Sequence, residues 1–425
     1  MRRWRETGDP EQPSPAPVIA PMIDHQSIYI FELMLGVLLV AIVVTRLAFD
    51  RLGMPSLAGF IALGFVLRVA DGQIAFMSGT GRHLLEFLAE TGVFILLFRI
   101  GLDSNLHGLV AKLPRAAPIW LGNVTLSGVP AFLLCHQVFD LGAVPSMFTA
   151  IAMTATSVAV TTELWREAGA LDTPDGETLI DVAELDDLSA VIFMAMAVAV
   201  APLVHSGDGG SLATHISEIS LILLAKAAAL GALCLAVAWA NQQRLAAILT
   251  RLGEPHAAMI LLGIGICVAA VASLLGFSIA IGAFFAGLIF SRNPDVVRME
   301  TGFVQIQAFF VPFFFIAIGF RIDPASLGMA LAFGGALLAV AVGGKIAGAG
   351  LPALMTTSGA GALLIGVSMV PRAEMAMVIG QQARDLGDWA MPAEVFSGIA
   401  LVALATSVAT PIVVHLLLRR WRPSG

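Results

Sequence analysis

The sequence alternates between long apolar stretches and short polar connections. Apolar runs of about 20 residues are long enough, at 1.5 Å rise per residue, to cross a ~30 Å hydrocarbon core as α-helices. The pattern predicts about thirteen membrane spans in an all-α membrane domain over residues 28–420, between tails at 1–27 and 421–425. The predicted spans lie near residues 28–48, 55–69, 84–101, 115–138, 146–166, 177–204, 216–240, 256–275, 278–291, 298–321, 327–354, 359–383 and 393–418.

Composition and charge agree with a multi-pass membrane protein. Hydrophobic residues make up 58% of the chain and charged residues only 12%, about half the share in soluble domains. The loops on the side of the C-terminus are much richer in arginine and lysine than the opposite loops, which hold Arg68, Arg82, Arg321 and Arg384. Basic loops stay in the cytoplasm, so we expect a cytoplasmic C-terminus, although Arg2 to Arg5 weakly favour the reverse orientation. No basic patch suggests nucleic acid as a partner.

The two halves of the chain resemble each other weakly. Residues 56–64 and 278–287 each carry two glycines five positions apart, and residues 154–162 and 366–374 are each a polar interruption within an apolar span. Paired interruptions in two halves are typical of inverted repeats whose broken helices cross near the membrane midplane. Chance similarity between alanine- and glycine-rich helices is the alternative.

Asp186 and Asp187 are adjacent acids inside the predicted span near 177–204. Ionisable groups in hydrocarbon cost ~2.5 kcal/mol or more each and are kept mainly where they face a cavity, a partner or a transported ion. A carboxylate shielded from water can take up a proton or a hard cation, which prefers carboxylate, hydroxyl and carbonyl oxygens. The hydroxyls that we expect to complete a shell around Asp187 are those of Thr154, Thr156, Ser157 and Thr161.

Lys345 is one of only three lysines and lies in a predicted span, which favours an ion pair that breaks during transport over a lysine reaching for water. We expect it to pair with Asp186 when no cation is bound. Arg372 and Glu374 are two positions apart and cannot share one helix face. They are predicted to support a broken helix by pairing with other spans, with Glu163 and Arg99 as candidates.

Six segments in order resemble the bacterial monovalent cation:proton antiporter-2 family, from about residue 28 to 420. They are residues 96–103 (Leu-Leu-Phe-Arg-Ile-Gly-Leu-Asp), 154–162, 183–188, 313–319 (Phe-Phe-Phe-Ile-Ala-Ile-Gly), Lys345 and 369–374 (Met-Val-Pro-Arg-Ala-Glu). The resemblance implies a thirteen-helix sodium/proton-antiporter fold. Its core helices would lie near 84–204 and 298–390, and its dimerisation helices near 28–70 and within 216–291.

The resemblance also implies a function: exchange of a monovalent cation for protons by a homodimer in the bacterial inner membrane, without a cofactor. Asp187 would be the sodium ligand, with Asp186 and Lys345 taking part in exchange. Lithium or potassium remain possible, and so does an electroneutral instead of an electrogenic cycle. Ala373 replaces a frequent glycine of the family, and Glu184 is an additional acid. A potassium-efflux transporter or an organic-anion symporter of the same fold are the alternatives; no His-Glu-x-x-His or Gly-x-Ser-x-Gly motif favours a hydrolase.

Overall fold

The computed structural model describes residues 25–52, 54–103, 106–157, 159–206, parts of 221–236, 254–275, 277–291 and 300–420. These residues form helices and their connections, without a β-strand. In chain order the helices are α1 (His25–Arg51), α2 (Ser56–Ile74), α3 (Gly79–Asp103), α4 (Leu106–Leu133) with the π-helical turn η1 (Leu134–Val138), α5 (Ala143–Thr154), α6 (Ala159–Glu167), α7 (Pro174–Ser206), α9 (Glu254–Leu274), α10 (Ile279–Phe290), α12 (Glu300–Arg321), the short 3₁₀ helix η2 (Pro324–Ser326), α13 (Leu327–Ala353), α14 (Gly359–Ser368), α15 (Glu374–Leu386) and α16 (Ala393–Arg420).

Twelve of the thirteen predicted spans coincide with these helices. Within the described part of the chain, eight helices are long and apolar enough to cross a membrane, and α5, α10 and α14 are shorter apolar helices. The predicted spans 146–166 and 359–383 are each divided in two, as α5 with α6 and α14 with α15, which confirms the two broken helices. The seventh predicted span, 216–240, lies largely outside the described residues.

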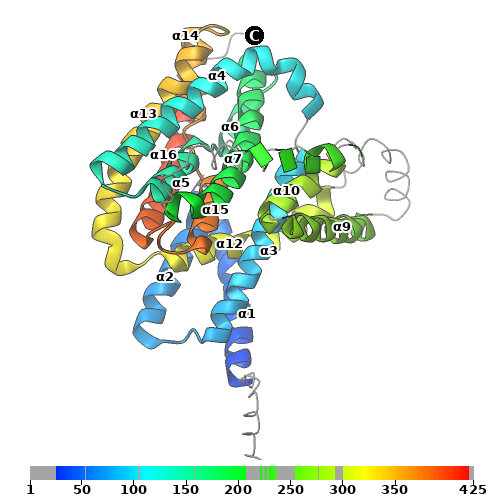
Figure 1. Ribbon diagram of the computed structural model, residues 1–425, viewed down its shortest axis with the longest axis vertical. Coiled ribbons are helices and arrows are strands. Elements are labelled where there is room, and N and C mark those ends of the chain that lie inside the picture. The colour runs from blue at the N-terminus through cyan, green and yellow to red at the C-terminus, as the bar shows by residue number, and fades with distance from the viewer. Residues whose placement is uncertain are drawn as a thin grey trace, which may run out of the picture.

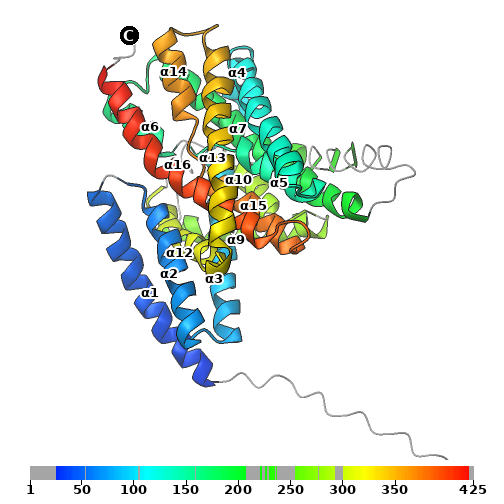
Figure 2. The same ribbon diagram turned by 90° about the vertical axis from the view of Figure 1, so that its left-hand side faces the viewer.

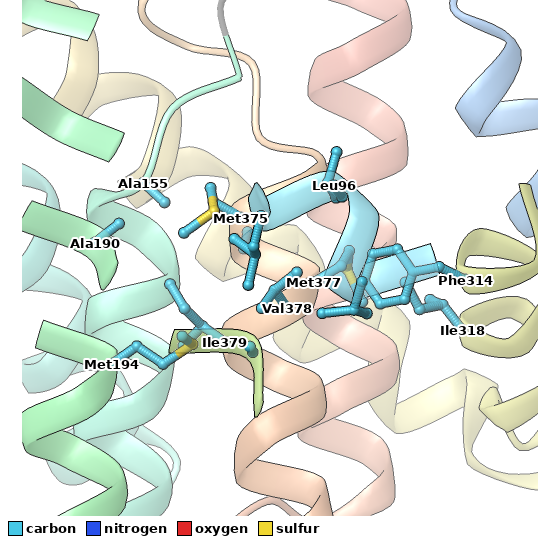
Figure 3. Packing of buried hydrophobic residues seen from close by; sticks show 14 of the residues in the cluster. Leu96, Ala155, Ala190, Met194, Phe314, Ile318, Met375, Met377, Val378 and Ile379 are labelled. Carbon is cyan, nitrogen blue, oxygen red and sulfur yellow. The ribbon is translucent and has the colours of Figure 1, made fainter. Parts of the chain in front are cut away.

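The helices pack in two groups (Figures 1 and 2). One group joins α1, α2, α3, α9, α10 and α12, and the other joins α4, α5, α6, α7, α13, α14, α15 and α16. Contacts between the groups include those of α16 with α2 and α12. Side chains of α15, among them Met377 and Val378, belong to the same hydrophobic cluster as Leu96 of α3 and Phe314 of α12 (Figure 3). The division into core and dimerisation helices stays a prediction.

Glycines bring the backbones of the first group into direct contact. A Cβ atom on Gly64 of α2 would lie 2.0 Å from the carbonyl oxygen of Ile316 in α12, so only glycine fits there. A Cβ atom on Gly287 of α10 would lie 2.1 Å from the carbonyl oxygen of Phe98 in α3. Small residues allow such close helix packing in membranes. Gly64 and Gly287 are the second glycines of the two similar segments, so these segments make matching contacts in the two halves.

Candidate functional site

The two broken helices meet at their interruptions. Helix α5 ends at Thr154 and α6 begins at Ala159, whereas α14 ends at Ser368 and α15 begins at Glu374. The backbone nitrogen of Ser157 donates a hydrogen bond of 2.8 Å to the carbonyl oxygen of Pro371. Proline cannot donate a backbone hydrogen bond and disfavours helical geometry in the preceding residue, which accounts locally for the second interruption. The crossing therefore leaves backbone carbonyls of α5 and α14 without helical partners.

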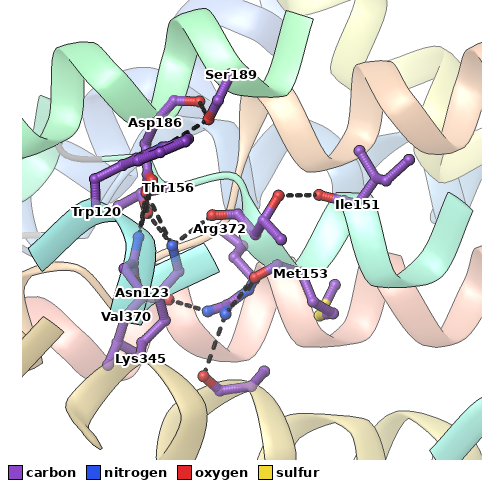
Figure 4. Close-up of polar contacts among 12 residues, drawn as sticks. Trp120, Asn123, Ile151, Met153, Thr156, Asp186, Ser189, Lys345, Val370 and Arg372 are labelled. Atoms are coloured by element: carbon purple, nitrogen blue, oxygen red, sulfur yellow. Dashed lines mark hydrogen bonds and ion pairs between the residues drawn. The ribbon is translucent and has the colours of Figure 1, made fainter. Parts of the chain in front are cut away.

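Arg372 binds backbone carbonyls at and around the crossing. Its buried guanidinium donates to the carbonyl oxygen of Met153 at 2.7 and 3.2 Å, to that of Val370 at 2.7 Å and to that of Ala341 at 3.2 Å (Figure 4). Met153 lies in the last turn of α5, where the helix dipole places partial negative charge. The planar guanidinium can serve several acceptors at once, which a lysine cannot do in the same geometry. Arg372 thus stabilises the crossing through backbone carbonyls instead of a carboxylate.

Lys345 and Asp186 form a fully buried ion pair beside the crossing. Lys345 Nζ lies 2.9 Å from Asp186 Oδ2, and both side chains are shielded from solvent. The ammonium also donates to the carbonyl oxygen of Thr154 and to Thr156 Oγ1, each at 2.5 Å. Three acceptors match the three N–H donors of the ammonium. The ion pair predicted between these residues is therefore present.

Asp186 has additional donors from α4 and from the extended segment between α5 and α6 (Figure 4). Asn123 of α4 donates from Nδ2 to Oδ1 and Oδ2 at 2.9 and 2.7 Å, and Thr156 Oγ1 lies 2.5 Å from Oδ2. The backbone carbonyl of Asp186 accepts from Ser189 Oγ at 3.0 Å, which in turn accepts from the indole of Trp120 at 3.0 Å. These contacts fix the carboxylate in a buried polar network, a costly arrangement unless its members are paired.

Asp187 lies next to this network and differs from Asp186 in its contacts. Its side chain is half-buried, and among the described residues none donates a hydrogen bond to it. The charged groups near enough to interact with it electrostatically are Glu374, Asp186, Lys345 and Glu184. Glu374, at the start of α15, accepts a hydrogen bond of 2.6 Å from Ser157 Oγ. Asp187 therefore has carboxylate oxygens that are available to a proton or a cation.

The polar residues of the first interruption do not form the expected hydroxyl shell around Asp187 in this structure. Thr154 Oγ1 donates to the carbonyl of Ile151 in its own helix, Thr156 binds Asp186 and Ser157 binds Glu374. Thr161 donates to the carbonyl oxygen of Ser368. The contribution of Thr154 to the site is its carbonyl, because that group is freed where α5 ends. Coordination of a cation by these residues stays a prediction.

The proposed pairing of Arg99 with Glu374 is wrong. Arg99 lies on α3, where it contacts Asp103 at 3.2 Å and Gln307 of α12 at 2.5 Å. The physical reason is that α3 packs against α10 and α12, so Arg99 lies in the group of helices that does not contain α15 and Glu374. The side chain of Glu163 lies outside the described residues. Glu374 remains at the crossing through Ser157.

Sequence reasoning missed Asn123, Trp120 and Ser189. Asn123 is an amide within the predicted span 115–138, and polar residues inside membrane spans are frequently interhelical contacts. That signal was present, but a lone amide gives no indication of which helix it faces. Asp181, an acid of α7 nearer its N-terminus, is buried and paired with Lys112 of α4 at 2.7 Å.

Comparisons with known proteins identify the class to which this fold and site belong. The sequence profile of the family described as sodium/hydrogen exchanger, transmembrane, matches residues 37–420, so the chain belongs to that family. Its members are secondary transporters, not enzymes.

Among similar proteins is the high-affinity Na(+)/H(+) antiporter NhaS3 of Synechocystis, which is 31% identical over 77% of this chain and 70% of its own length. The Na(+)/H(+)-K(+) antiporter GerN of Bacillus cereus is 28% identical over 86% of this chain and 92% of its own length. The solved structure of the sodium proton antiporter MjNhaP1 from Methanocaldococcus jannaschii matches with a TM-score of 0.63 and 14% identity, covering 93% of this chain and 97% of that one. This last likeness supports the fold alone.

Proposed function

We propose that this protein is a secondary antiporter that exchanges a monovalent cation, in the first place sodium, for protons across the bacterial inner membrane. The observation that carries the proposal is the buried Lys345–Asp186 ion pair beside the half-buried Asp187 at the crossing of two broken helices. A site at such a crossing can face either side of the membrane when one group of helices moves relative to the other. Proton and cation then compete for Asp187, which is sufficient for exchange.

The role of each residue follows from its contacts. Asp187 binds the proton or the cation, because its carboxylate has no described hydrogen-bond donor. Asp186 and Lys345 separate when the cation enters and pair again when it leaves. Glu374 adds negative charge near the cation, and Arg372 holds the carbonyls of the crossing in place. The relatives that carry sodium in their names support sodium as the first substrate, with lithium and potassium as alternatives.

The orientation and the assembly are further parts of the proposal. Arg419 and Arg420 end α16 on the side where we expect the cytoplasm, following the bias of basic loops. We expect a homodimer formed through α1, α2 and the helices within 216–291.

The experiment is a transport assay in inverted membrane vesicles, in which fluorescence quenching reports the proton gradient. At least one of the salts sodium chloride, lithium chloride and potassium chloride should dissipate the proton gradient when it is added. Choline chloride and vesicles without the protein are the controls. Absence of a response to all three cations, over the range from neutral to alkaline pH, would contradict the proposal.

A further inference from the structure

Two buried polar atoms of α4, the helix that also contributes Asn123 Nδ2 to Asp186, have no hydrogen-bond partner within the described part of the chain. Among the described residues, Asn123 Oδ1 and Ser127 Oγ are the buried side-chain oxygens without a hydrogen-bond partner. Both residues are on α4, one helical turn apart, and neither side chain is exposed. An unsatisfied polar group in the interior costs about as much as a lost hydrogen bond, so two of them in one place require an explanation.

The orientation of the Asn123 amide is fixed by its neighbour. Its Nδ2 faces both oxygens of Asp186, at 2.9 and 2.7 Å. Turning the amide over would place Oδ1 against a carboxylate, which would repel it. Oδ1 therefore points away from Asp186 as a free acceptor.

Asn123 and Ser127 lie on the face of α4 that packs against α13 on either side of Lys345: a Cβ atom on Gly348 would lie 2.9 Å from the Cα atom of Asn123. Asn123 Nδ2 and Lys345 Nζ share Asp186 Oδ2 as acceptor, at 2.7 and 2.9 Å, so the amide and the ammonium are neighbours (Figure 4). Ser127 packs against the residue that precedes Lys345: a Cβ atom on Gly344 would lie 3.0 Å from the Cα atom of Ser127. The two residues that carry the free acceptors thus face the part of α13 that holds Lys345.

A cation at Asp186 and Asp187 would leave the ammonium without its carboxylate. The ammonium would keep the Thr154 carbonyl and Thr156 Oγ1 as acceptors but lose its counter-ion, and a buried charge that has lost its counter-ion is strongly destabilised. We propose that Asn123 Oδ1 and Ser127 Oγ receive the Lys345 ammonium when a cation displaces it from Asp186. The free acceptors of the cation-free state then become the partners that stabilise the cation-bound state. This inference rests on the proposed function.

The test measures cation binding and not only transport. Ser127→Ala removes one acceptor and leaves every described hydrogen bond of the cation-free state intact. Its melting temperature without sodium should equal or exceed that of the unmodified protein. The sodium concentration that gives half of the maximal thermal stabilisation should rise about tenfold, the weight of one hydrogen bond to a charged group. The KM for sodium in vesicles should rise in parallel, with little change in maximal rate.

Two further variants make the result specific. Ser397→Ala is the matched control, because Ser397 is a buried serine of α16 whose hydroxyl donates to Ala393 of its own helix. It should leave the half-saturating sodium concentration unchanged. In a Lys345→Gln background, which has no ammonium to receive, Ser127→Ala should have no further effect on sodium binding.

Three results would overturn the inference alone: an unchanged half-saturating sodium concentration in Ser127→Ala, an equal loss of stability with and without sodium, or an undiminished effect in the Lys345→Gln background. The first would indicate that the two acceptors bind water. No response to any alkali cation in the unmodified protein would instead overturn the proposed function, and this inference with it.

Discussion

The backbone N–H of Ser157 donates a hydrogen bond to the carbonyl oxygen of Pro371, so the two interrupted helices touch through their extended segments. The segment between α5 and α6 contributes two hydroxyls there: Ser157 Oγ donates to Glu374 at the start of α15, and Thr156 Oγ1 donates to Asp186 of α7. Because helix ends with opposite partial charges converge there, the crossing can hold cations and anions that a continuous helix could not satisfy.

Asp187→Asn should abolish cation-dependent proton movement while the protein remains folded. The amide cannot exchange a proton for a cation, and Asp187 has no described hydrogen bond whose loss would destabilise the fold. Vesicle transport measures the first effect, and melting temperature with size-exclusion chromatography measures the second. Antiport by this variant above the level of vesicles without the protein would contradict the assignment of Asp187.

Lys345→Ala should destabilise the protein by ~3 to 5 kcal/mol, because it leaves Asp186 charged and buried without its ammonium. Adding Asp186→Asn should restore part of this loss. Thermal or denaturant unfolding in detergent gives both values as a double-mutant cycle.

The matched control is the partly exposed pair of Arg321 with Asp385, which are 3.2 Å apart. Such pairs contribute roughly 0 to 1 kcal/mol, so Arg321→Ala should have a much smaller effect. If the two losses at Lys345 and Asp186 add fully, the residues are not energetic partners.

The half-saturating sodium concentration should rise as the pH falls. A proton on Asp187 excludes the cation from the same oxygens, so more sodium is needed at acidic pH and less at alkaline pH. Transport rates at several sodium concentrations and pH values separate this competition from a change in maximal rate. A constant KM with a changing maximal rate would place the proton on a different group.

Exchange is electrogenic, with two protons moved for each sodium ion, if Lys345 gives up its proton when the cation binds. If the displaced ammonium keeps its proton, Asp187 alone exchanges and the cycle is electroneutral. In the electrogenic case the membrane potential should change the rate. Sodium entry into proteoliposomes then carries one net positive charge outward, and an inside-positive potential should accelerate it. Valinomycin and potassium set the potential at equal pH on both sides. A potential of 100 mV is worth ~2.3 kcal/mol per charge moved. A sodium transport rate that does not change with membrane potential would indicate exchange of one proton for one sodium ion at Asp187.

Much of the fold was predictable because hydrophobic length and small-residue patterns are local properties of the sequence. The predicted spans near 146–166 and 359–383 contained Thr154 to Thr162 and Gly366 to Glu374, and both are interrupted at these segments. The pairing of Lys345 with Asp186 followed from the cost of leaving either charge alone in the membrane.

The partners of Arg99 and Arg372 were not predictable, since the sequence does not tell which helices face each other. A guanidinium that binds backbone carbonyls, as Arg372 does at Met153, leaves no complementary residue type to search for. The same holds for Asn123, whose function depends on α4 lying against α7 and α13.

The close approach of α2 to α12 at Gly64, and of α10 to α3 at Gly287, has a consequence for how the protein can move. Backbones that touch have no layer of side chains between them that could rearrange, so neither pair of helices can slide without a collision. Any movement during a transport cycle must then take place where α15 and α16 contact these closely packed helices. A bulky side chain at Gly64 would prevent correct folding and would not merely slow transport.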